Sequence, residues 1–165
     1  MPQHGITAQA AYGRRSPDSV CLGDFPTTTQ RKISVMMTYH TFLANIFSLC
    51  KFIGSDLPSR VWVDGEAGVT SVVSPEEFFE QAFGDNDLEN MILRFSTELK
   101  AEHAYPAITA YRDSLLKLEA LFDAKQGIEP RKFLASEEWL NLCSAVGQVM
   151  ALPAARTAFQ QGYGR

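Results

Sequence analysis

Apolar residues recur with helical spacing over residues 33–53, the most apolar stretch of the chain. They occupy positions 33, 36, 37, 43, 46, 47, 50 and 53, and Gly54 and Pro58 follow as a stop signal. Further apolar residues widen the set to most of the helix circumference: Val35, Phe42, Leu49 and Phe52. A helix that is apolar on most sides is contacted on several sides. The pattern therefore predicts a central core helix.

The same stretch is long enough to be tested as a membrane span, which takes roughly 20 apolar residues. Its Leu, Ile, Val and Phe residues would favour insertion by only roughly 3–5 kcal/mol. His40 and Asn45 lie near its middle, and an unpaired amide in hydrocarbon costs about 4–8 kcal/mol. We therefore predict a helix buried in protein and do not expect a membrane partner.

Residues 60–74 read RVWVDGEAGVTSVVS, and their pattern differs from the helical one before them. Val, Trp and Thr are typical of strands, and DGEAG between the two Val-rich runs is typical of a turn. The segment predicts a short β-hairpin over about residues 60–73. Because two strands alone are only marginally stable, we expect this hairpin to lie against helices.

The remaining chain carries mostly helical signals. Ser74 followed by Pro75 and two Glu residues predicts a helix over residues 75–83. Residues 85–103 follow as an amphipathic helix capped by Asp85 or Asp87. Beyond it, Tyr105-Pro106 permits either two antiparallel helices or one kinked helix. A last clear helix starts at Ser136 and ends or kinks at Pro153, and residues after it add a final turn or two.

These elements indicate a mainly α single-domain bundle of five or six helices, with the hairpin inserted between the first and second. Residues 1–28 are rich in Gly, Pro, Ser, Thr and Gln and lack periodicity, so we expect a flexible or partner-ordered arm. The helical domain is then expected to cover residues 29–165. A length of 165 residues with 45% apolar and 21% charged residues fits one folded domain.

Charge and cysteine usage indicate the kind of partner and the cellular compartment. A net charge of -4 gives no overall positive field to draw the chain onto nucleic acid. Cys21, Cys50 and Cys143 are widely spaced and form no CxxC pair, which fits neither a disulfide framework nor a zinc site. The N-terminal residues do not match a secretory signal. We expect a cytoplasmic protein with reduced thiols.

Candidate chemistry is sparse. His40 lacks a second ligand or base one turn away and is expected to be a buried or half-buried, locally bonded histidine, and His103 a helix-end histidine near a carboxylate. No phosphate-binding glycine loop occurs, and DNDLEN at residues 85–90 lacks the Gly and Glu of a calcium loop. We therefore predict no catalytic, metal or cofactor site. A small enzyme built on His40, His103 or Cys21 stays the weakest alternative.

Two features suggest binding instead. Basic residues occur as three pairs, which could form a nucleic-acid surface if folding joined them: Arg14 and Arg15, Arg31 and Lys32, Arg131 and Lys132. The chain also has 18 aromatic residues, more than a simple core accommodates, and four are candidates for a protein interface: Trp62, Phe79, Phe159 and Tyr163. The leading hypothesis is a non-enzymatic interaction protein, such as an adaptor, an inhibitor or a small subunit of an assembly, whose partner is another protein or a second copy. The alternative is an accessory nucleic-acid-binding subunit.

Overall fold

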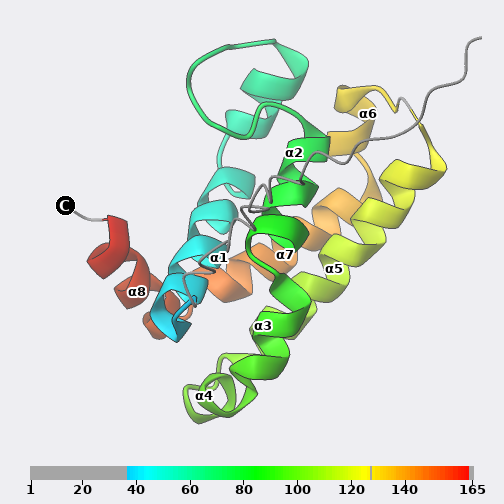
Figure 1. The fold of residues 1–165 in the computed structure, drawn as a ribbon. Helices are drawn as coiled ribbons and strands as arrows, with labels where there is room; N and C mark the ends of the chain where they lie inside the picture. The colour runs from blue at the N-terminus through cyan, green and yellow to red at the C-terminus, as the bar shows by residue number, and fades with distance from the viewer. Residues whose placement is uncertain (1–36, 127, 164–165) are drawn as a thin grey trace, which may run out of the picture. The chain divides into compact units, whose positions relative to one another are not determined.

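The computed structural model describes residues 37–126 and 128–163, which form eight α-helices, α1 to α8, and two π-helical turns, η1 and η2 (Figure 1). The mainly α class is confirmed. The inserted β-hairpin is wrong, because residues 60–73 contain no strand, and the helices outnumber the expected five or six. The predicted arm, residues 1–28, lies outside the described residues.

Helix α1, Tyr39–Ile53, is the buried central helix that the apolar spacing predicted. Phe42, Ile46 and Leu49 are at most 6% exposed. The helix begins at Tyr39 because Thr38 is extended and its hydroxyl accepts a hydrogen bond of 3.2 Å from the backbone N–H of Thr41. Helices α7 and α8 both pack against α1. None of the helices in the described ranges is both long and apolar enough to span a membrane.

The predicted hairpin is replaced by η1, Ser59–Val63, and an irregular loop. Val61 and Trp62 are both buried. In a helical turn, consecutive residues are rotated by much less than the half-turn between neighbours in a strand, so both side chains can face one core, whereas strand neighbours face opposite sides. The Arg60 guanidinium donates hydrogen bonds of 2.7 and 2.8 Å to the two carboxylate oxygens of Glu66, which closes the loop. Tertiary burial therefore overrides the strand-forming composition.

Helix α2, Pro75–Phe79, starts as predicted: the Ser74 hydroxyl accepts a hydrogen bond of 3.2 Å from the backbone N–H of Glu77. It continues into η2, Glu80–Asp85, and is followed by α3, Leu88–Arg94, and α4, Ser96–Ala101. The predicted helix over residues 85–103 is therefore interrupted, at Phe95. Asp87 precedes α3 in a left-handed conformation and makes no capping bond, since its carboxylate accepts from the Asn90 side chain instead.

Helix α5, Tyr105–Ala124, is a separate helix and not the continuation of a kinked one, because His103 adopts a φ of 56° at the turn before it. It runs antiparallel to α3, against which it packs (Figure 1). The short α6, Pro130–Leu134, follows, and then α7, Glu137–Met150, capped by Ser136 as predicted. Helix α8, Pro153–Tyr163, is longer than the expected turn or two.

Candidate functional site

Two aromatic side chains lie together on the last helix, α8. The rings of Phe159 and Tyr163 are stacked with centroids 5.3 Å apart and planes 25° apart. Residues four apart share one helix face, so this pairing follows from local spacing. Tyr163 is 55% exposed. The sequence hypothesis named both residues as interface candidates, and the structure brings them together.

Tyr163 is exposed yet held in place by a chain of hydrogen bonds. Its hydroxyl donates to Asn45 Oδ1 at 2.7 Å, and Asn45 Nδ2 donates to Asn86 Oδ1 at 2.8 Å. Asn86 is 7% exposed, and it lies in the short connection between η2 and α3. The three residues therefore link α8, α1 and this connection.

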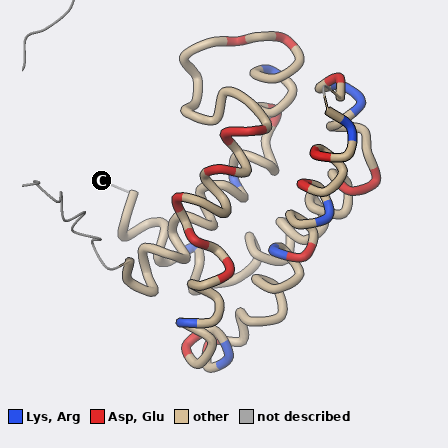
Figure 2. The backbone as a smooth tube through the Cα atoms, turned by 45° about the vertical axis from the view of Figure 1, so that its right-hand side comes forward, with Lys and Arg blue, Asp and Glu red and all other residues tan. Residues whose placement is uncertain are grey.

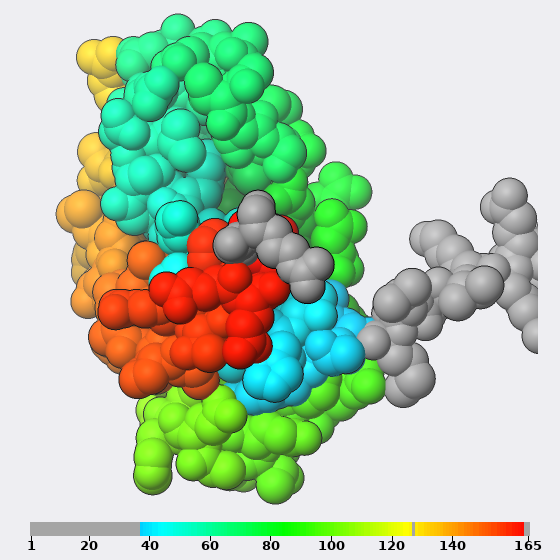
Figure 3. Space-filling view, turned by 90° about the vertical axis from the view of Figure 1, so that its left-hand side faces the viewer, coloured from blue at the N-terminus to red at the C-terminus, as the bar shows by residue number. Residues whose placement is uncertain are grey.

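Small residues let α8 lie close to α1 and so position the aromatic pair (Figure 3). A Cβ atom at Gly162 would lie 3.6 Å from the Cβ atom of Ala44, an ordinary contact. The ring of Phe159 lies 5.2 Å from that of Phe47 on α1, measured between centroids. Its face is also covered by Lys51, whose Nζ lies 4.7 Å from the ring centroid. Packing against α1 therefore holds the Phe159 ring, on which Tyr163 stacks, in place.

Three hollows surround the pair. The first has a volume of about 220 Å³ and is lined by Asn45, Ser48, Leu49, Gln81, Asp85, Asn86 and Tyr163. A second, of about 410 Å³, shares Tyr163 and extends along α1 to His40, and a third, of about 290 Å³, shares Ser48 and reaches Phe159. We call the following residues the Tyr163 surface: Asn45, Ser48, Lys51, Asp85, Asn86, Phe159 and Tyr163.

The part of the chain that the structure describes is strongly acidic. It carries 10 Lys and Arg against 17 Asp and Glu, a net charge of -7. Residues 61–93 contain eight of these acids and no Lys or Arg, and Figure 2 shows acidic positions following one another along α2, η2 and α3. Asp85 belongs to this run and forms no salt bridge with any described residue. The first hollow therefore lies at the edge of a negative region.

The other two interface candidates, Trp62 and Phe79, are part of the core. They are only 8% and 6% exposed. The Trp62 ring lies 5.7 Å from that of Trp139 and 6.1 Å from that of Phe133, measured between centroids. Buried aromatic rings pack in such tilted and edge-to-face pairs. These two side chains therefore present little surface to a partner.

Only one of the three basic pairs falls in the described residues. Arg131 and Lys132 are both exposed on α6, and Lys132 Nζ lies 3.8 Å from a carboxylate oxygen of Glu129. The other four residues lie outside the described residues: Arg14, Arg15, Arg31 and Lys32. That the three basic pairs form one nucleic-acid surface therefore stays a prediction.

The residues weighed for catalysis are not brought together. His40 is exposed beside Tyr39, contrary to the expected buried or half-buried position, and His103 is exposed at the turn before α5. Burial raises the pKa of the Cys50 thiol, which favours its unreactive protonated form. Cys21 lies outside the described ranges. Across residues 37–126 and 128–163, His, Cys, Asp and Glu form no group of three or more that could hold a metal ion.

Sequence reasoning missed the amides that hold Tyr163. Asn45 does carry a signal, since it is an amide within an apolar helix, and a buried polar group requires a hydrogen-bonding partner. Asn86 carries none, because Asn next to Asp is common in loops.

Comparisons with models of known protein families, with curated proteins and with solved structures found no match.

Proposed function

We propose that the protein is a non-enzymatic interaction protein that binds another protein through the Tyr163 surface. One observation carries the proposal: Tyr163 is 55% exposed, while its hydroxyl is held by Asn45 at 2.7 Å. Its ring is also stacked on Phe159. A large exposed aromatic side chain is thus fixed before any partner arrives.

Fixing a side chain in advance favours binding, because ordering one mobile side chain at an interface costs about 0.5–1.5 kcal/mol. Tyrosine is also among the residues that most often dominate binding energy at protein interfaces. The two hollows lined by Tyr163 and the third, lined by Phe159, can accept side chains of a partner. These properties suit an adaptor, an inhibitor or a small subunit of an assembly, which we place in the cytoplasm because the cysteine pattern fits reduced thiols.

The test compares variants of the full chain. The wild type, Tyr163→Ala and Leu140→Ala are used to capture partners from a lysate of the source cells, and binding of the purified partner is then titrated. Leu140 is the matched control, since it is 61% exposed on α7 and lies outside the Tyr163 surface. We expect Tyr163→Ala to weaken binding about 10- to 30-fold, as at an interface hot spot, and Leu140→Ala to leave it unchanged. Equal binding by all three proteins would contradict the proposal.

A second copy of the chain is the other candidate partner, and analytical ultracentrifugation tests it. Self-association through the Tyr163 surface should fall in Tyr163→Ala and persist in Leu140→Ala. Self-association that Tyr163→Ala leaves intact would place the contact elsewhere.

The nucleic-acid alternative is favoured by one observation, the exposure of both Arg131 and Lys132 on α6. The charge of -7 over the described residues opposes it. Filter binding of nucleic acid over a salt series tests this alternative. Phosphate contacts release counterions, so the affinity for nucleic acid must fall steeply as the salt concentration rises. An Arg131→Ala/Lys132→Ala variant should reduce that slope. A flat salt response rejects the alternative.

A further inference from the structure

We infer that the hollow between η1 and α6 binds a carboxylate group, which the indole N–H of Trp62 and the guanidinium of Arg131 hold together. We call it the Trp62 hollow. It is separate from the Tyr163 surface, so the inference does not depend on the proposed function.

The indole of Trp62 is a hydrogen-bond donor without an acceptor. Its Nε1 is buried and has no hydrogen-bond partner among the described residues, and the residue as a whole is only 8% exposed. Nε1 is the one polar atom of an indole, and it can only donate. A donor that is buried without an acceptor destabilises a fold. A ligand that supplies an acceptor therefore recovers this loss.

The packing of Trp62 shows from which side an acceptor can approach. Four aromatic rings that carry no oxygen acceptor lie 5.5 to 6.1 Å from the indole, measured between centroids: Phe52, Phe78, Phe133 and Trp139. Elsewhere the side chain lines a hollow of about 240 Å³, together with Val63, Glu129, Pro130 and Arg131. An acceptor from outside the chain therefore approaches through this hollow.

Arg131 brings a positive charge to the same hollow. It is exposed and forms no salt bridge with any described residue. Phe133, two residues on, is fully buried against Trp62 and anchors α6 beside η1. A guanidinium donates two parallel hydrogen bonds to one carboxylate, whose remaining lone pairs can accept from an indole N–H. One carboxylate can thus engage both donors.

Size and charge favour a carboxylate over a phosphate. The volume of the hollow equals about eight water molecules of about 30 Å³ each. This is room for one head group and a short apolar part, which Val63 and Pro130 can contact. Glu129 on the rim and the net charge of -7 over the described residues repel added negative charge. A carboxylate carries one such charge, whereas a phosphate monoester carries nearly two.

Binding must move a side chain of the rim, because Nε1 is buried. The two charged rim residues, Glu129 and Arg131, are exposed and can turn without disturbing the core. Trp62 itself lies in η1, a π-helical turn, and such turns are rare and occur frequently at functional sites.

The test follows the indole N–H directly. ¹⁵N-labelled full-length protein is titrated with isobutyrate, and separately with isobutyramide, which has nearly the same shape and no charge. Trp62→Phe assigns the two indole signals, since the other tryptophan is Trp139. We expect isobutyrate to move the Trp62 indole proton downfield and to slow its hydrogen exchange. Isobutyramide should bind about two- to fivefold more weakly, the range of an exposed ion pair.

Two neighbouring cations provide the matched comparison. Arg131→Gln should weaken isobutyrate binding by the same factor. Lys132→Gln should not, because Lys132 does not line the hollow and lies 3.8 Å from a carboxylate oxygen of Glu129. An unmoved Trp62 signal, equal binding of both probes, or an unaltered Arg131→Gln variant would overturn the inference. Tighter binding of inorganic phosphate than of isobutyrate would overturn the choice of ligand.

A third probe distinguishes the two sources of a carboxylate. It is a short N-acetylated peptide that ends in valine, used with a free and with an amidated C-terminus. If the free-acid peptide binds more tightly than isobutyrate and amidation abolishes the gain, the carboxylate is the chain end of a partner protein. Equal binding of peptide and isobutyrate assigns the hollow to a small free acid. Capture of partners by Tyr163→Ala tests the proposed function independently of these titrations.

Discussion

The hydroxyl of Tyr163 donates a hydrogen bond of 2.7 Å to Asn45 Oδ1, although the two residues are 118 positions apart in the sequence. This bond joins the exposed end of α8 to the buried central helix α1. It fixes an aromatic side chain at the surface without burying it. Stability and binding should therefore both depend on Asn45.

Asn45→Ala should lower the free energy of unfolding by about 1–3 kcal/mol, because it removes two hydrogen bonds worth about 0.5–1.5 kcal/mol each. Tyr163→Phe removes only one and should cost about half as much. Urea denaturation of both variants and of the double variant measures this. The single effects should add to more than the effect of the double variant, because the two residues share a bond. Strict additivity would mean that the bond does not form in solution.

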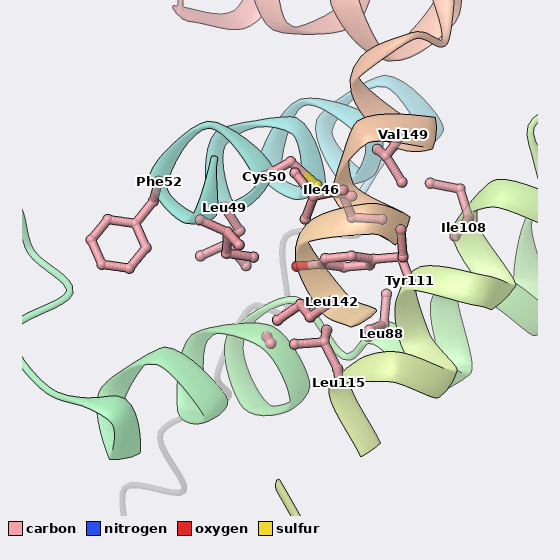
Figure 4. Packing of buried hydrophobic residues seen from close by; sticks show 14 of the residues in the cluster. Ile46, Leu49, Cys50, Phe52, Leu88, Ile108, Tyr111, Leu115, Leu142 and Val149 are labelled. Atoms are coloured by element: carbon pink, nitrogen blue, oxygen red, sulfur yellow. The ribbon is translucent and has the colours of Figure 1, made fainter. Parts of the chain in front are cut away.

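Tyr111→Phe should raise the free energy of unfolding, by about 1 kcal/mol, which is the reverse of the usual effect of this substitution. The Tyr111 hydroxyl is buried among Leu115, Leu142 and other apolar residues and has no hydrogen-bond partner among the described residues (Figure 4). The substitution therefore removes a polar group that is buried without a hydrogen bond.

Tyr39→Phe is the matched control for Tyr111→Phe, because the Tyr39 hydroxyl donates a bond of 2.8 Å to Glu102 and its loss should destabilise. Both variants are compared by thermal and urea unfolding. Destabilisation by Tyr111→Phe would show that its hydroxyl has a partner.

Stability should fall at alkaline pH in two steps. Burial raises the pKa of Cys50 and of Tyr111 in the folded state. The folded protein then keeps protons that the unfolded chain releases, so stability is complete below about pH 8.5, the ordinary value for cysteine, and declines above it. A second decline begins near pH 10, the ordinary value for tyrosine, and each group contributes at most about 1.4 kcal/mol per pH unit.

Urea unfolding at a series of pH values measures the two declines. Cys50→Ala lowers stability at every pH because it leaves a cavity, but it should flatten the decline between about pH 8.5 and 10. Tyr111→Phe should flatten the decline above pH 10. Unchanged slopes in both variants would assign the alkaline loss to other groups.

The predicted parts of the fold are those fixed by local or periodic signals. The buried helix α1 follows from apolar spacing, and the starts of α2 and α7 follow from Ser74 and Ser136, whose hydroxyls accept from backbone groups three residues on. The prediction of a hairpin over residues 60–73 is wrong because packing against residues distant in the sequence determines the conformation of this segment. Trp62 lies against Trp139, Phe133 and Phe52, which no local pattern over residues 60–73 reveals.

The same distinction applies to the candidate site. The aromatic content predicts that some rings lie at the surface, and Tyr163 does, whereas Phe159 is half-buried. Trp62 and Phe79 were grouped with them because aromatic content alone does not separate core from surface. The bonds among Tyr163, Asn45 and Asn86 span 118 and 41 positions and have no periodic signature. They form only where α8 and the connection between η2 and α3 meet α1.

Two glycines should respond in opposite directions to alanine. Gly147 lies within α7, and a Cβ atom added there would meet no atom within 4 Å, so Gly147→Ala should stabilise the protein by about 0.5–1 kcal/mol through reduced entropy of the unfolded chain. Gly68, in the loop that replaces the hairpin, has a φ of +78°. Gly68→Ala should destabilise by about 1–2 kcal/mol, because a Cβ atom is strained in the left-handed region.

Thermal unfolding of the two glycine variants measures the difference, and circular dichroism checks that helix content is kept. Gly68 also tests the correction to the hairpin. In the loop its positive φ is required, whereas an extended strand residue would accept alanine at little cost. If Gly68→Ala were neutral while Gly147→Ala stabilised, Gly68 would not adopt a left-handed conformation in solution, and an extended backbone would be restored as an alternative for the segment after η1.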